Sequence, residues 1–138
     1  MTVLVVDAQG GGLGRQLVSG ILREVPSAHV LAVGTNTAAT AAMIKAGAHE
    51  AATGENSVVV ASRRADVIVG PLGIVLADAM LGEITPVMAR AIGQARATRV
   101  LIPFASCDTY VAGVQELATG VLIQDAVLRV KDILCKSH

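Results

Sequence analysis

The residues best suited to chemistry stand near the start of the chain, in a loop of glycines. Four glycines occupy five positions closely behind the apolar run at residues 3–6: Gly10, Gly11, Gly12 and Gly14. A strand that runs through such a turn into a helix brings unpaired N–H groups and a positive dipole end to one point. In α/β proteins, that point binds phosphate groups. The spacing therefore predicts an anion site at these backbone N–H groups, with Gln9 at its edge.

The loop matches no complete nucleotide fingerprint. In the dinucleotide register G-x-G-x-x-G, Gly11 and Gly14 take the second and third glycine positions, but the first position is Gln9. The Walker pattern fails because Arg15 and Gln16 replace the lysine and the hydroxyl residue. A tight strand–helix turn that binds no ligand stays an alternative.

Two polar residues, Thr35 and Asn36, follow the second apolar run. A dinucleotide site usually carries Asp or Glu here to hold the ribose hydroxyls. Thr35 and Asn36 could hydrogen-bond a sugar hydroxyl, or they could only cap the following helix. NAD(P) is therefore possible as a cofactor but not favoured, and the cofactor stays unknown.

Three carboxylates are candidates for acid–base or metal-directed work: Asp7, Glu55 and Glu83. Asp7 ends the first apolar run and could hold Mg²⁺ or a hydroxyl, or it could fix the turn by accepting loop N–H groups. Glu83 could instead pair with Thr85 at a helix entry. No catalytic residue is assigned, and no cluster of His, Cys or carboxylates has metal-ligand spacing.

Composition narrows the class of protein. The chain has 138 residues and no net charge, with 11 basic and 11 acidic side chains. This balance gives no sign of a nucleic-acid or anionic-membrane surface. Hydrophobic residues make up 53% and mean hydropathy is +0.62, more than a domain of this size can bury. We therefore expect a homo-oligomer.

Membrane insertion does not explain this hydrophobicity. The longest stretch without Lys, Arg, Asp or Glu, residues 25–44, contains Pro26 and Asn36 and follows a strand–turn–helix pattern. The first residues lack the features of a secretion signal. Cys107 and Cys135 lack CxxC spacing, which suits the reducing cytoplasm. No base is evident beside Cys107, so an inert thiol is expected there.

Strands alternate with helices along the chain. Apolar runs predict strands at residues 2–7, 29–33, 48–52, 67–70 and 100–103. Helices are expected at residues 12–24, 37–47, 54–64, 74–81, 86–97 and 119–134. The segment 54–64 is ambiguous, because its three consecutive valines favour a strand locally. The alternation predicts an α/β fold: a Rossmann-like three-layer sandwich with a parallel five-stranded sheet in the order 3-2-1-4-5, as one domain over residues 1–138.

This topology positions the expected site. Ligands of open α/β sheets bind in the crevice where the strand order reverses, here between the first and fourth strands. The glycine loop would then lie beside the loop after the fourth strand. The candidate ligand-binding residues are Asp7, Gln9, Gly10, Gly11, Gly12, Gly14, Thr35, Asn36, Gly70, Pro71 and Gly73.

Several segments resemble a family of small bacterial Rossmann-like proteins catalogued as a domain of unknown function. The resemblance rests on residues 5–14, 34–36, 52–56, 70–74 and 81–86, and residues 102–103 and 111–114 extend it over almost the whole chain. It implies the fold and names no reaction.

These observations together predict binding of a nucleotide or another phosphorylated small metabolite at the glycine loop. The reaction is unknown, and whether the protein is an enzyme is open. The alternative is a non-catalytic oligomeric sensor or assembly subunit that uses an apolar helical interface, with the C-terminal helix as its working surface.

Overall fold

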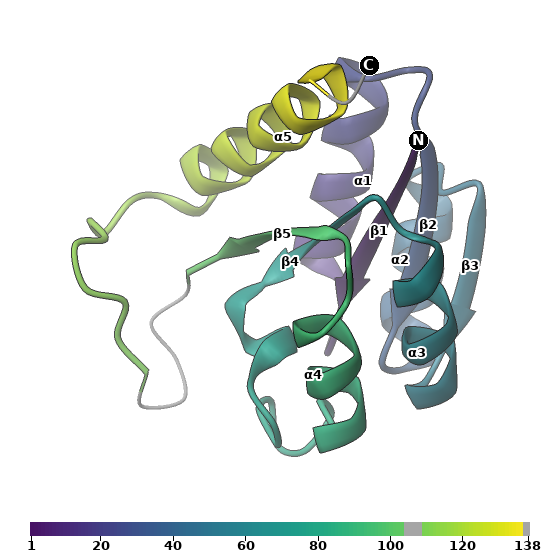
Figure 1. The fold of residues 1–138 in the computed structure, drawn as a ribbon, viewed down its shortest axis with the longest axis vertical. Coiled ribbons are helices and arrows are strands. Elements are labelled where there is room, and N and C mark those ends of the chain that lie inside the picture. The colour runs from purple at the N-terminus through teal and green to yellow at the C-terminus, as the bar shows by residue number, and fades with distance from the viewer. Residues whose placement is uncertain (104–108, 137–138) are drawn as a thin grey trace.

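Figure 1 shows the fold in a computed structural model, which describes residues 1–103 and 109–136. Five parallel strands form one sheet in the order β3-β2-β1-β4-β5. They are β1 (Thr2–Asp7), β2 (His29–Gly34), β3 (Glu50–Thr53), β4 (Val67–Pro71) and β5 (Thr98–Ile102). The predicted α/β class and strand order are confirmed.

Helices cover both faces of the sheet and complete the three layers. One face carries α1 (Gly12–Glu24), α2 (Thr37–Lys45) and α5 (Thr119–Lys136), and the other carries α3 (Glu55–Arg64) and α4 (Pro86–Gly93). Alternate side chains of β1 divide between two apolar cores. Val3 and Val5 pack with α1 and α5, whereas Leu4 and Val6 pack with α3 and α4. Because both faces are covered, the central strands are unbroken apolar runs.

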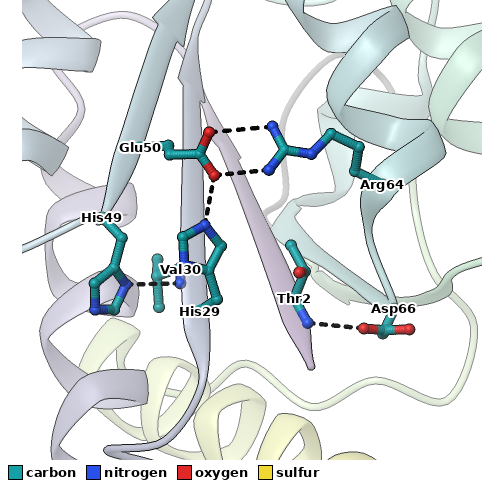
Figure 2. Close-up of polar contacts among 7 residues, drawn as sticks. All are labelled: Thr2, His29, Val30, His49, Glu50, Arg64 and Asp66. Carbon is teal, nitrogen blue, oxygen red and sulfur yellow. Dashed lines mark hydrogen bonds and ion pairs between the residues drawn. The ribbon is translucent and has the colours of Figure 1, made fainter.

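A polar network joins the elements at the end of the sheet where β2 and β3 begin (Figure 2). The guanidinium of Arg64 donates two hydrogen bonds to Glu50, of 3.2 and 2.7 Å, and His29 Nε2 contacts the same carboxylate. His49 Nδ1 accepts a hydrogen bond from Val30 N–H at 2.9 Å. Arg64, and after it His29, lower the pKa of Glu50 to about 2. This network lies at the opposite end of the strands from the glycine loop.

Most predicted elements are confirmed, with small shifts at their ends. β1 and α1 have the predicted bounds, and the ambiguous segment is the helix α3. Two caps fix helix starts: the Asn36 side chain accepts from Ala39 N–H, and the Thr85 hydroxyl accepts from Met88 N–H. Thr85 thus caps its own helix, and the pairing with Glu83 that the sequence left open as an alternative is not observed.

The helix predicted at residues 74–81 is wrong. A short 3-10 helix, η1 (Leu72–Val75), leads into a turn-rich stretch at residues 76–85, which we call the 76–85 connection. Four of its residues have positive φ: Gly82, and the non-glycine residues Asp78, Met80 and Leu81, whose φ values are 67°, 58° and 57°. An α-helix cannot continue through left-handed residues, although the apolar spacing there is helical.

The segment that leads into α5 is exposed. Residues 109–118 form no regular element, and every residue from 110 to 121 is exposed. In Figure 1 this green segment loops away from the sheet before α5 returns to lie beside α1. α5 packs so closely on α1 that a Cβ added at Gly20 of α1 would lie 2.8 Å from Val127 of α5. Within residues 1–103 and 109–136, no helix is long and apolar enough to cross a membrane.

Candidate functional site

A cleft of about 340 Å³ opens at the carboxyl ends of β1 and β4, where the strand order reverses. Its walls are residues 7–13 on one side and Pro71, Leu72, Gly73, Leu76 and Met80 on the other. The glycine loop therefore lies beside the loop after β4. A volume of this size falls at the lower end of the range for small-molecule sites.

The first turn of α1 presents backbone donors in this cleft. No described residue accepts a hydrogen bond from the N–H of Gly12 or Leu13. The other two N–H groups are engaged: Gly11 donates within the turn, and Gly14 donates to Asp7 Oδ2 at 2.6 Å. An anion in the cleft would thus meet two N–H groups and the positive end of the helix.

Asp7 holds the glycine loop through hydrogen bonds and is only 5% exposed. Its carboxylate accepts from Ala8 N–H at 2.8 Å and from Gly14 N–H at 2.6 Å. Burial raises the pKa of Asp7; the two N–H donors oppose this rise, and the negative charge of Glu83 adds to it. Asp7 also lines the cleft. An anionic ligand would therefore meet a carboxyl group whose protonation is already favoured by burial.

Two glycines of the loop are required by packing. Gly11 has a φ of 73°, and an added Cβ would lie 2.7 Å from the Cα of Ala39 in α2. A Cβ at Gly14 would lie 2.7 Å from Met43 Sδ and 2.8 Å from Asp7 Cβ. Glycine at these two positions lets α1, α2 and β1 approach one another. Packing alone therefore explains both glycines, without a bound ligand.

Gly10 and Gly12 have no such packing requirement. An added Cβ would meet nothing within 4 Å at either position, and neither residue has positive φ. Both line the cleft. Their missing side chains leave the backbone open to a ligand, which is the feature that a phosphate site needs.

The residues predicted for the opposite wall also divide into those that line the cleft and one that serves packing. Pro71 and Gly73 line the cleft, but Gly70 does not. A Cβ at Gly70 would lie 2.4 Å from the carbonyl oxygen of Val6, so this glycine serves the close pairing of β4 with β1.

Thr35 and Asn36 do not line the cleft but hold Glu83. The Oε1 atom of Glu83 accepts from Thr35 Oγ1 at 2.6 Å, from Asn36 Nδ2 at 2.8 Å and from Gln9 N–H at 3.0 Å. Asn36 Nδ2 also donates to the carbonyl of Gln9 at 2.9 Å. These bonds, that of Thr35 foremost, hold the pKa of Glu83 below its usual range. The loop after β1, the end of β2 and the 76–85 connection therefore meet at one carboxylate.

Sequence reasoning missed this role of Glu83, because its partners are 47 to 74 residues away. The one available signal was the lack of an acidic residue after β2. Among the other candidates, Glu55 begins α3 and does not line the cleft, and Cys107 lies outside the described residues. In residues 1–103 and 109–136, no group of three His, Cys, Asp or Glu side chains could hold a metal ion.

Comparisons with known proteins concern the fold and the family. No curated protein matches the chain. Among solved structures, a dodecameric FMN-dependent UbiX-like decarboxylase from Escherichia coli O157:H7 is similar over 96% of this chain and 76% of its own, with 17% identity and a TM-score of 0.45. A likeness of that degree says nothing about the ligand of this chain. The model of a family described as a domain of unknown function, DUF3842, matches residues 2–135, and the chain belongs to that family.

Proposed function

We propose that the protein binds a nucleotide or another phosphorylated small molecule in the cleft between residues 7–13 and the loop after β4. One observation carries this proposal. Gly10 and Gly12 line the cleft with no packing reason to be glycine, beside the unpaired N–H groups at the start of α1. A phosphate on those N–H groups explains both features.

The remaining walls fit the rest of such a ligand. Leu72, Leu76 and Met80 give the far side of the cleft an apolar surface, against which a base or a carbon skeleton could pack. The phosphate would lie near Asp7. While that carboxyl group is ionised, it repels an anionic ligand, so its protonation favours binding.

A thermal-shift screen with nucleotides, NAD(P), sugar phosphates and inorganic phosphate tests the proposal. We expect at least one phosphorylated compound to raise the melting temperature, because a ligand that binds only the folded state stabilises it. Gly12→Val should abolish this rise. Gly93→Val is the matched control, since Gly93 also belongs to a helix, α4, and an added side chain there enters open space outside both the cleft and residues 110–121. The proposal fails if no phosphorylated compound shifts the wild type, or if Gly12→Val responds like the wild type.

We propose self-association as a second function, on a separate observation. Exposed large apolar side chains gather in and near the segment before α5: Tyr110, Val111, Val114, Leu117, Val121 and Leu128. The apolar face of α5 is itself buried on α1 and the sheet. The segment at residues 110–121, rather than that face, is therefore the surface that a second copy would cover.

Light scattering coupled to size-exclusion chromatography tests this second proposal. The double variant Val114→Asp, Leu117→Asp should lower the molar mass of the particle to that of one chain. Leu81→Asp, which changes an exposed apolar residue on the 76–85 connection, should not. A wild-type protein that is already monomeric at high concentration would rule the proposal out.

A further inference from the structure

The carboxylate of Glu83 is fixed through only one of its two oxygens. All three hydrogen bonds, from Gln9, Thr35 and Asn36, end on Oε1. No residue in the described part of the chain donates to Oε2. Oε2 is itself a charged acceptor, so it keeps its capacity for a donor that is not part of the fold.

This carboxylate stands at the edge of the glycine loop, next to the end of β2. In sheets of this strand order, an acidic residue at that end holds the ribose hydroxyls of a nucleotide whose phosphates lie on the glycine loop. β2 ends here at Gly34, where an added Cβ would lie 2.5 Å from Thr40 Oγ1 and 2.6 Å from Thr40 N. No side chain fits at Gly34, so the last residue of β2 cannot supply the acid.

The 76–85 connection supplies a carboxylate at the same place. Glu83 does not itself line the cleft, but it accepts hydrogen bonds from both residues that follow β2, Thr35 and Asn36, and from the N–H of Gln9, a residue that does line it. We propose that Glu83 Oε2 accepts a hydrogen bond from a ribose hydroxyl of the bound ligand. The ligand is then a ribonucleotide with a free 2′-hydroxyl, because a 2′-phosphate would set a second negative charge against the carboxylate. This inference rests on the proposed function and narrows its ligand.

A purely structural role for Glu83 makes different predictions. Glu83→Gln keeps an oxygen for the three donors but replaces the charged oxygen with an amide. Thr35→Val removes one donor to Oε1 and leaves Oε2 in place. If Glu83 only joined the loops, both variants would affect stability and neither would change which sugar is preferred.

The experiment is a calorimetric titration of the full chain with ribonucleoside diphosphates of the four bases and their 2′-deoxy counterparts. We expect the wild type to bind the better ribonucleotides roughly tenfold or more tightly than the deoxy forms, as a hydrogen bond to a charged group gives. Glu83→Gln should reduce this ratio severalfold and improve the relative binding of adenosine 2′,5′-bisphosphate. Thr35→Val should lower the melting temperature and keep the ratio.

The outcomes separate this inference from the proposed function. Equal binding of ribonucleotides and deoxyribonucleotides to the wild type, or an unchanged ratio in a folded Glu83→Gln variant, would overturn the role of Glu83 alone. Binding of sugar phosphates without any ribonucleotide would do the same. If no phosphorylated compound binds the wild type, the proposed function fails and this inference fails with it.

Discussion

Gly12 and Gly14 belong to the same first turn of α1 but have opposite surroundings. We expect Gly14→Ala to lower the free energy of unfolding by about 1–3 kcal/mol, because its Cβ would press on Asp7 and Met43. Gly12→Ala should leave stability unchanged or raise it by up to about 1 kcal/mol, since it enters open space in a helix. Urea unfolding measures both values. Equal losses at the two positions would refute the division between packing and cleft glycines.

Asp7 should make phosphate binding depend on pH. Burial raises the pKa of this carboxyl group, and a phosphate on the adjacent N–H groups would raise it further. Binding then takes up a proton, so affinity increases as the pH falls toward the pKa of Asp7. Calorimetric titration across the acid-to-neutral range should show a steeper pH dependence in the wild type than in Asp7→Asn.

The difference between the wild type and Asp7→Asn gives the contribution of Asp7 to the pH dependence, because the titration of the phosphate itself is common to both proteins. The variant must first be shown to melt cooperatively, since an amide cannot accept from both Ala8 N–H and Gly14 N–H as the carboxylate does. Parallel pH profiles would exclude a charged Asp7 beside the ligand.

At the scale of elements, Glu50 joins β3, an edge of the sheet, to β2 and α3. Its pKa in the folded protein is about 2, below the ordinary value of 4.5, because Arg64 and His29 stabilise the charged form. The folded state therefore binds fewer protons than the unfolded state between these values, and the contribution of Glu50 is lost as the pH falls through them. Melting curves of the wild type and Glu50→Gln should differ most above about pH 5 and converge toward pH 2. A gap that is constant with pH would contradict this.

Local patterns predicted most of these elements because their signals lie within a few residues. An apolar run followed by glycines gave the bounds of β1 and α1, and the polar residue before each of α2 and α4 acts as its cap. The same reasoning failed at residues 74–81. Helical spacing of apolar side chains is present there, but three left-handed residues turn the chain instead.

The candidate site was predictable only in part, for a related reason. The crevice between β1 and β4 follows from topology, which the strand pattern determines. Glu83 does not follow, since its partners come from two other loops and no local pattern connects them. Which glycines serve packing also depends on α2, through Ala39 and Met43, and these contacts cannot be read from spacing.

At the scale of the whole molecule, the cleft and the Glu50 network lie at opposite ends of the strands. Five steps along β2, from His29 to Gly34, span about 16 Å at roughly 3.3 Å per residue. Sites separated by this distance and sharing no partner contribute nearly independently.

We therefore expect Glu50→Gln to lower the melting temperature without changing the affinity for a phosphorylated ligand. The rise in melting temperature that the ligand causes should be the same in the variant as in the wild type. A changed dissociation constant would show that the two ends of the sheet are coupled.

The hydrogen bond from Gln9 N–H to Glu83 has a consequence for amide exchange. Gln9 is an exposed residue in a turn, and such amides normally exchange with solvent at once. The Gln9 N–H donates to the carboxylate of Glu83 at 3.0 Å, so its proton should exchange only when the 76–85 connection detaches. The exchange rate of the Gln9 amide, measured by nuclear magnetic resonance, would then report that detachment, and Glu83→Ala should abolish the delay.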